Sequence, residues 1–153
     1  MSYELNTVAN AFIRKARDSG RNDLTPMKLL KLVYIAHGWS LGINNRPLFL
    51  EEVQAWKFGP VIPELYDQVK QYRSSPIEHE LPESSCGNHF DENDQALINQ
   101  VWAKYGQHDG IRLSAITHQP GTPWDTTWDR RGFHGLIIPT PLIRDHYHQL
   151  ARA

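Results

Sequence analysis

Apolar residues recur at three- and four-residue steps along residues 3–18, the spacing that places side chains on one face of an α-helix. The apolar positions are Leu5, Val8, Ala9, Phe12, Ile13 and Ala16. Basic residues occupy the last turns, where cations favour the negative end of the helix dipole, and Gly20 follows. The pattern predicts a first helix over residues 3–18.

A second run, from Met27 to Leu41, is apolar or aromatic at most positions, with Lys28 and Lys31 as a short polar stripe. Thr25-Pro26 precedes it, and this pair is a favourable helix start because threonine caps and proline fits the first position. A helix that is apolar on several faces is usually the central one of a bundle. We therefore expect a central helix that begins at Thr25-Pro26.

Residues 47–58 show no single period. Their apolar positions (Leu48, Leu50, Val53, Ala55 and Trp56) are compatible with a short hairpin or with an extended segment. Gly59-Pro60 is expected to break this run. Residues 63–70 predict a third helix with Pro63 in its first turn.

Residues 73–90 carry loop chemistry, with Ser74-Ser75-Pro76 and a polar stretch from Pro82 to Asn88. They predict an exposed, mobile connector with a brief strand at 77–81. Cys86, the single cysteine, lies in this connector with no positive charge beside it. We expect an ordinary exposed thiol, because reactive cysteines need an electropositive setting.

Helical signals return after the connector. Acidic residues at 91–94 favour a helix start, and the helix is expected to run to Tyr105. A short helix is expected over 111–116, and Thr122-Pro123 and Thr140-Pro141 repeat the Thr-Pro start signal. The predicted fold class is mainly α: a single-domain bundle of about six helices over residues 1–153, with a small β-hairpin near residues 47–58.

Composition limits the classes of function. The net charge is −1, but residues 74–110 carry one lysine against seven acids, while both flanking parts are mildly basic. This distribution makes a general nucleic-acid surface unfavourable, although the acidic middle could contact a basic partner. No apolar run is long enough to span a membrane, no signal peptide is visible, and one cysteine fits a reducing compartment. We expect a cytoplasmic protein.

The chain has eight histidines, yet their spacing does not predict a metal site. His146 and His148 are two apart and point to different faces of a helix. His37 lies inside the central helix. A core histidine is the favoured interpretation, and a buried acid/base group is the alternative. His118 ends a helix before an irregular loop, but no serine, cysteine or carboxylate is placed by sequence to make it catalytic. Glycine loops that bind nucleotides are absent.

Trp56-Lys57-Phe58-Gly59-Pro60 is the strongest candidate for a partner surface. Glycine and proline are expected to prevent regular structure where two aromatic residues flank a lysine. The turn could present Lys57 and one aromatic residue, or both aromatic residues could be buried. Trp124 and Trp128 are four apart and would share a helix face, with core packing favoured. Arg130-Arg131 and the pair Asp125 and Asp129 are weaker signals.

Taken together, these segments resemble the Panacea domain, a family also described as SocA-like or phage-associated. The resemblance rests on the segments 24–37, 39–42, 47–49 and 55–66, of which Ala55 to Tyr66 is the most specific. It continues in Leu113 to His118, Pro123-Trp124, Ile138 to Pro141 and Tyr147. Nearly the whole chain is covered, apart from a variable connector at about 73–90. Gln119 to Thr122 stand where the family usually has an acidic residue.

The resemblance implies an antitoxin of a toxin–antitoxin system, which neutralises a cognate protein toxin encoded by a neighbouring gene through direct protein–protein binding. It implies no established catalytic residues and no cofactor, and together with the histidine spacing we expect no metal site and no enzyme. The residues expected to bind the partner are Trp56, Lys57, Phe58, Pro60, Pro63, His118 and Trp124.

Two other classes of function remain open at this stage. The chain could be an adaptor that delivers a bound partner to a protease. It could also be a small hydrolytic enzyme that uses His118 or His37. DNA binding is disfavoured by the near-neutral charge and the lack of a distinct recognition helix.

Overall fold

The computed structural model describes residues 2–84, 89–128 and 135–153, and in these it contains seven α-helices, one 3-10 helix and three short strands. The helices are α1 (Leu5–Asp18), α2 (Pro26–Asn44), α3 (Pro63–Val69), the 3-10 helix η1 (Lys70–Tyr72), α4 (Glu92–Tyr105), α5 (Gly110–Thr117), α6 (Pro123–Thr127) and α7 (Thr140–Arg152). The strands are β1 (Gln54–Trp56), β2 (Gly59–Val61) and β3 (Leu136–Ile137). The mainly α fold class is confirmed. Among these described residues, no helix is long and apolar enough to cross a membrane.

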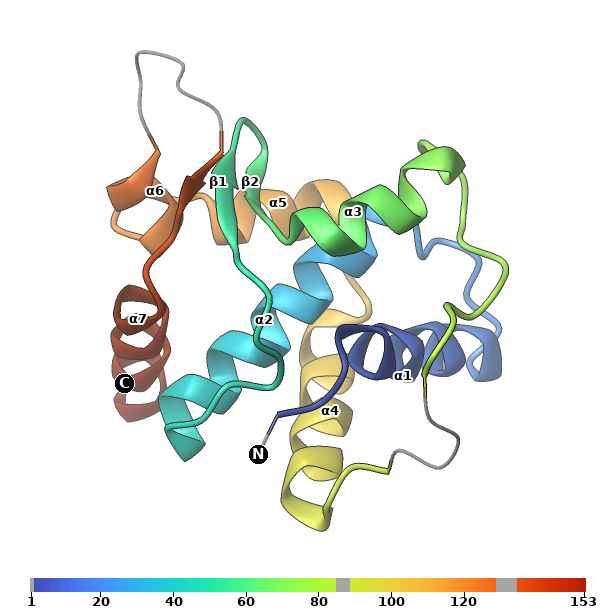
Figure 1. Cartoon of the computed structure of the whole chain (residues 1–153), viewed down its shortest axis with the longest axis horizontal. Coiled ribbons are helices and arrows are strands. Elements are labelled where there is room, and N and C mark those ends of the chain that lie inside the picture. Colours follow the sequence, from blue (N-terminus) through green and yellow to red (C-terminus); the bar gives the residue numbers. More distant parts are fainter. Residues whose placement is uncertain (1, 85–88, 129–134) are drawn as a thin grey trace.

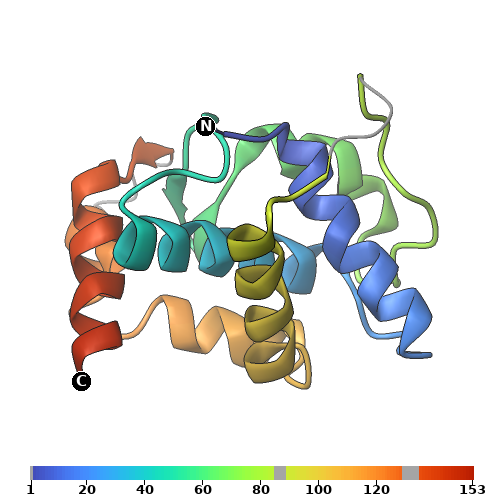
Figure 2. The ribbon, with the colours of Figure 1, turned by 90° about the horizontal axis from the view of Figure 1, so that it is seen from below.

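Helix α2 is the centre of the molecule. Figures 1 and 2 show it passing through the middle, with α1, α4, α5 and α7 around it, and all four pack against it. Fifteen of its residues are buried, which explains why its sequence is apolar on several faces. The Thr25 side chain accepts a hydrogen bond from the Lys28 amide and caps the helix as predicted. The central helix is therefore confirmed.

The polar stripe of α2 does not face solvent. Lys28 is 0% and Lys31 2% exposed. The Lys28 ammonium is neutralised by Asp23, with Nζ to Oδ1 at 3.1 Å, and donates to the Gly106 carbonyl at 2.6 Å. Burial of a lysine requires such partners, and the partners come from segments that periodicity cannot place beside it.

Helix α7 lies unusually close to α2, because Gly38 and Gly42 face it. A Cβ atom at Gly38 would overlap the ring of Tyr147, and one at Gly42 would lie 2.6 Å from the backbone of His148. Small residues four apart let two helix backbones approach each other. Tyr147 is buried there and packs edge-on against Tyr34 and Trp39.

The hairpin exists, but its strands are 54–56 and 59–61 rather than 47–58. Trp56 pairs with Gly59, and Lys57 and Phe58 form the two-residue turn. Gly59-Pro60 is therefore part of a strand, and the expectation that it breaks regular structure was wrong. Proline is tolerated because β2 is an edge strand of the order β2-β1-β3. The other edge, β3, comes from beyond α6 and pairs antiparallel with β1.

The connector differs from the prediction as well. Its described residues contain no strand at 77–81, and instead this part of the chain is attached to α1. The Asn10 amide donates to the Leu81 carbonyl at 2.8 Å, and the Leu81 amide donates back to Asn10 at 2.7 Å. Ile77 is buried, so this half of the connector is not simply exposed. Cys86 lies outside the described residues.

Two of the three Thr-Pro signals act as expected. Thr25 and Thr122 both cap helices through their side chains, the latter accepting from the Asp125 amide at 3.3 Å. Helix α7 instead includes Thr140, with Pro139 before it and no side-chain cap. Helices α4 and α5 are capped by Asp91 and Asp109, whose carboxylates accept backbone N–H groups at 2.8 Å.

Candidate functional site

The hairpin is held by three side chains from three different helices, each bound to a backbone carbonyl. The Trp124 indole N–H of α6 donates to the Trp56 oxygen at 2.6 Å, and the Ser114 hydroxyl of α5 donates to the Phe58 oxygen. The Lys31 ammonium of α2 donates to the Pro60 oxygen at 2.9 Å. Figure 1 shows the hairpin with α6 on one side and α3 on the other. Its backbone is therefore fixed from several directions.

The turn of this anchored hairpin is exposed. Lys57 is exposed, and Phe58 is 59% exposed, which is unusual for a large aromatic side chain. The Lys57 ammonium lies 5.5 Å from the Phe58 ring centroid, within reach of a cation–π interaction. Trp56 is half-buried and packs edge-on against Tyr66, with ring centroids 5.0 Å apart. One aromatic residue anchors the turn and the other is presented, as one of the two sequence interpretations had it.

Gly59 closes the turn at a place where no other residue fits easily. Its φ is +119°, a conformation that side chains rarely adopt, and a Cβ atom there would lie 3.2 Å from the Lys31 ammonium. The close approach lets β2 pass directly over Lys31. A glycine at this position follows from both the backbone angle and the buried cation.

A groove of about 490 Å³ lies between the hairpin, the first turns of α2 and the segment from α3 to Arg73. Among the residues that the structure describes, it combines apolar walls with three cations, Lys31, Lys57 and Arg73, and no acidic residue lines it. Its other lining residues are Pro26, Met27, Leu30, Trp56, Phe58, Val61 and Tyr66. Arg73 has a φ of +55°, an uncommon backbone conformation for a residue with a side chain.

Lys31 is the unusual charge of this groove. Burial lowers the pKa of its ammonium to about 7, because water no longer solvates the charged form. Lys28, one turn earlier, has Asp23 as a counterion, and no carboxylate among the described residues bonds to Lys31. The two buried lysines of α2 thus differ in that only Lys28 has a carboxylate partner among the described residues.

The predicted partner-binding residues lie in or near the hairpin. Some of them line the groove, and the others do not. Trp56, Lys57 and Phe58 line the groove, whereas Pro60 is buried in β2 and Trp124 is 8% exposed beneath the hairpin. Pro63 is half-buried and begins α3. His118 ends α5, and its ring packs edge-on against Trp124 at 5.2 Å between centroids.

The two histidines considered for catalysis, His118 and His37, make contacts within the fold. His118 lies 3.4 Å from the Ser114 hydroxyl, but that hydroxyl already donates to the Phe58 carbonyl. His37 accepts the Leu48 amide at 3.2 Å and stacks on Phe49 at 4.0 Å between centroids, and burial lowers its pKa to about 4. It is the core histidine that the sequence favoured. No cluster of three or more metal-ligating side chains occurs among the described residues.

Among the weaker sequence signals, Trp128 stacks on Trp124 with centroids 5.4 Å apart. Asp129, Arg130 and Arg131 lie outside the described residues. Sequence reasoning missed several groove residues, notably Met27, Leu30 and Arg73. The available signal was Lys31, a charged residue inside the largely apolar run of α2.

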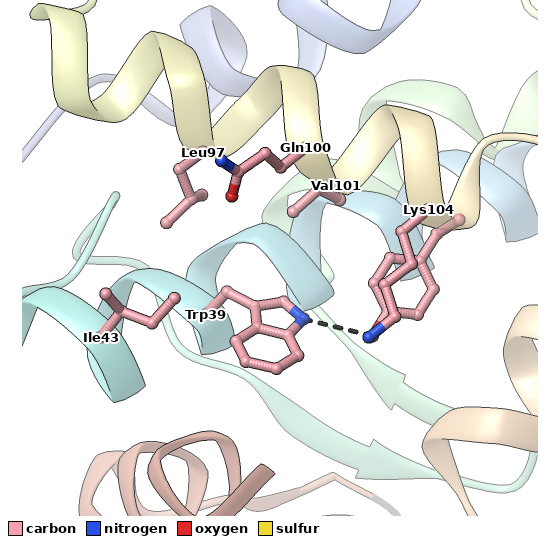
Figure 3. A pocket seen from close by; sticks show the side chains of 7 residues that line it. Trp39, Ile43, Leu97, Gln100, Val101 and Lys104 are labelled. Atoms are coloured by element: carbon pink, nitrogen blue, oxygen red, sulfur yellow. Dashed lines mark hydrogen bonds between the residues drawn. The ribbon is translucent and has the colours of Figure 1, made fainter. Parts of the chain in front are cut away.

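A second, smaller pocket of about 160 Å³ lies between α2 and α4 (Figure 3). Trp39 and Ile43 project from α2, and Leu97, Val101 and Lys104 project from α4. The Trp39 indole donates to the Tyr105 hydroxyl at 3.2 Å, and the Lys104 ammonium lies 5.2 Å from the Trp39 ring centroid. This pocket contains none of the predicted partner-binding residues.

Comparison with known proteins adds the family. The model of the antitoxin SocA-like, Panacea domain family matches residues 29–125, which include most of α2, the hairpin, α3, α4, α5 and the start of α6. The chain belongs to this family. Antitoxin SocA of Caulobacter vibrioides (strain NA1000 / CB15N) is 29% identical over 160 aligned residues, covering 95% of this chain and 83% of that protein. No solved structure matches the Panacea-domain chain.

Proposed function

We propose that this Panacea-domain protein is an antitoxin that neutralises a cognate protein toxin by direct binding, in the cytoplasm, without catalysis. Family membership supports the class of function. The observation that carries the binding mechanism is the exposed pair Lys57 and Phe58 on a hairpin whose backbone is fixed by Trp124, Ser114 and Lys31. The toxin is proposed to be the product of a neighbouring gene.

A fixed turn is well suited to recognition. Ordering a loop on binding opposes association, and a turn that is already ordered avoids this cost. Aromatic residues are enriched at the cores of protein interfaces, and Phe58 presents an exposed ring beside an apolar groove. A stable complex would bury roughly 800 Å² on each partner, so the groove would form the centre of a larger contact.

Co-expression with the product of the adjacent open reading frame tests the function. We expect that product to inhibit growth alone, and the antitoxin to restore growth and co-purify with it at a fixed ratio. A harmless neighbour that does not bind would overturn the antitoxin assignment.

The outcome also separates other mechanisms. Growth restored without a complex, with a shortened half-life of the partner, would indicate an adaptor for a protease. Growth restored at sub-stoichiometric amounts would indicate catalysis, and His118→Ala would then be the next variant.

Surface variants test where the toxin binds. Phe58→Ala and Lys57→Glu are expected to weaken the complex at least tenfold without changing the thermal midpoint of unfolding, because both side chains are exposed. Leu50→Ala is the matched control, since Leu50 is 78% exposed and does not line the groove. Full neutralisation by the Phe58 and Lys57 variants would place the toxin elsewhere, with the Trp39 pocket as the next surface to test.

A further inference from the structure

We propose that the groove beside the hairpin receives an aspartate or glutamate side chain of the partner protein, with a large apolar side chain next to it. This inference rests on the proposed function, because it specifies which chemistry of the partner the binding surface recognises. The carboxylate would meet Lys31 and Arg73, and its apolar neighbour would contact the wall formed by Met27, Leu30 and Tyr66.

The charge of the groove indicates an anion. Lys31, Lys57 and Arg73 line it, and no acidic side chain within residues 2–84, 89–128 and 135–153 does, although the chain as a whole has a net charge of −1. Glu52 and Glu78, the acidic residues nearest in sequence to Lys57 and Arg73, do not line the groove. Three cations gathered on apolar walls, with no acidic side chain among the described lining residues, are complementary to a negatively charged group.

Lys31 gives the most specific argument. Its ammonium has three N–H donors, and the described residues give it one acceptor, the Pro60 carbonyl. A buried ammonium without a counterion is unfavourable unless its remaining donors find partners. Lys28 shows how this chain satisfies a buried lysine when the partner is internal, through Asp23 and the Gly106 carbonyl. At Lys31 the corresponding carboxylate would come from the partner protein.

Edge strand β2 is unsuited to another common way of binding a peptide, in which the peptide adds a strand to the sheet. A partner strand could add to β2 through backbone hydrogen bonds only if β2 offered free donors and acceptors. Pro60 has no N–H, and its carbonyl is already bound to Lys31. Recognition at this face therefore uses side chains that enter the groove.

Size and wall chemistry indicate the apolar neighbour. About 490 Å³ is far more than one carboxylate needs and lies in the range of pockets that enclose several groups. Most of the lining is apolar or aromatic. A nucleic acid would bring phosphates as well, but it would need a longer basic track than three cations provide.

Two capped dipeptides provide a direct test on the full chain. Acetyl-Glu-Phe-amide and acetyl-Gln-Phe-amide differ only in charge, and two-dimensional NMR can follow the Gly59 amide and the Trp56 indole N–H during titration. We expect the Glu peptide to bind at least fivefold more tightly than the Gln peptide. Acetyl-Gln-Phe with a free carboxyl terminus shows whether a terminal carboxylate can substitute.

Variants connect the binding to the groove. Lys31→Met and Arg73→Gln are each expected to weaken the Glu peptide at least fivefold. Lys70→Gln is the control, because Lys70 is exposed on η1 and does not line the groove. Arg73→Gln keeps the test valid if Lys31→Met does not fold, since Arg73 is exposed.

Three results would overturn the proposal: equal binding of the Glu and Gln peptides, no effect of either groove variant, or tighter binding of decathymidylate at the same resonances. Its failure is distinguishable from failure of the antitoxin function. If growth is restored by co-expression and the peptides do not discriminate, only the groove proposal is wrong. If the Glu peptide binds and the neighbouring gene product is not neutralised, the antitoxin function is wrong.

Discussion

The ammonium of Lys31 donates a hydrogen bond to the carbonyl oxygen of Pro60 over 2.9 Å, joining two residues 29 apart in the chain. This bond connects the central helix to the edge strand that carries the candidate partner-binding turn. It also keeps a lysine inside the protein without a carboxylate beside it among the described residues. The same side chain therefore supports the hairpin and lines the groove proposed to bind the partner.

Replacing Lys31 by methionine should change how stability depends on pH. Burial lowers the pKa of Lys31 to about 7 in the folded chain, from 10.5. Between these values the unfolded chain binds one proton that the folded chain does not, so the free energy of unfolding rises with pH. The burial penalty is complete below pH 7 and is relieved above it. Lys31→Met removes this rise.

Urea unfolding at pH 6.5 and 9.5 measures the effect. The stability of the wild type relative to Lys31→Met should increase by roughly 2–4 kcal/mol between the two pH values, close to one proton over three pH units. Other titrating groups cancel because both proteins share them. Parallel curves for the two proteins would mean that Lys31 stays charged or exposed.

His37 should cause a stability loss on the acidic side. It is neutral at pH 7, because burial lowers its pKa to about 4 from 6.5, and its Nδ1 accepts the Leu48 amide. Between pH 6.5 and 4 the unfolded chain takes up a proton that the folded chain resists, so stability falls with acidification. Protonation would also remove the acceptor for Leu48.

His37→Gln keeps an acceptor but cannot titrate. From pH 6.5 to 4 the wild type should lose roughly 2 kcal/mol more than this variant, measured by urea unfolding. His79→Gln is the control, because His79 is exposed. An identical acid response of the wild type and His37→Gln would contradict the buried, neutral histidine.

The helical part of the fold could be predicted because its signals are local. Thr25 with Pro26, and Asp91 before an amphipathic run, define helix starts within a few residues. The sequence placed the hairpin at the wrong residues because a Gly-Pro pair usually disrupts strands. Pro60 is tolerated in β2 only because β2 is an edge strand and because Lys31 bonds to the Pro60 carbonyl. Strand β3 could not be predicted, since Ile137 pairs with Gln54 far away in the chain.

The candidate site likewise has a part that could be predicted from the sequence and a part that could not. Trp56, Lys57 and Phe58 were predictable as a surface because aromatic residues and a lysine share one turn. Arg73 was not, because it reaches the groove only through the packing of α3 against α2. The anchoring function of Trp124 depends on a hydrogen bond between residues 68 apart, which no local pattern encodes.

The attachment of the connector to α1 predicts the effect of Asn10→Ala. Asn10 is 1% exposed and bonds to both backbone groups of Leu81 and to the Glu83 carboxylate at 2.7 Å. Loss of these bonds should cost about 1–3 kcal/mol, because buried polar groups lose their partners. Limited proteolysis should cleave within 74–84 faster than in the wild type. Asn99→Ala, an exposed change on α4, should have no such effect, and equal cleavage of Asn10→Ala and wild type would contradict this role.

The contact between α2 and α7 predicts that adding one methyl group is harmful. Gly38→Ala would normally favour a helix, yet its Cβ atom would overlap the Tyr147 ring. Overpacking of this kind costs about 1–3 kcal/mol. Tyr147→Val removes the ring, so it should be less destabilising in the Gly38→Ala background than in the wild type.

Gly42→Ala should respond differently, because its Cβ atom would meet the backbone of Tyr147 and His148 at 2.6 Å. Trimming a side chain cannot relieve a clash with backbone atoms. Thermal unfolding of the four proteins in each double-mutant cycle measures the coupling. We expect a favourable coupling of about 1 kcal/mol or more for Gly38 with Tyr147 and clearly less for Gly42 with Tyr147. Equal coupling in the two cycles would mean that α7 shifts as a whole, so that the spacing of the helices, rather than the Tyr147 ring, determines the cost.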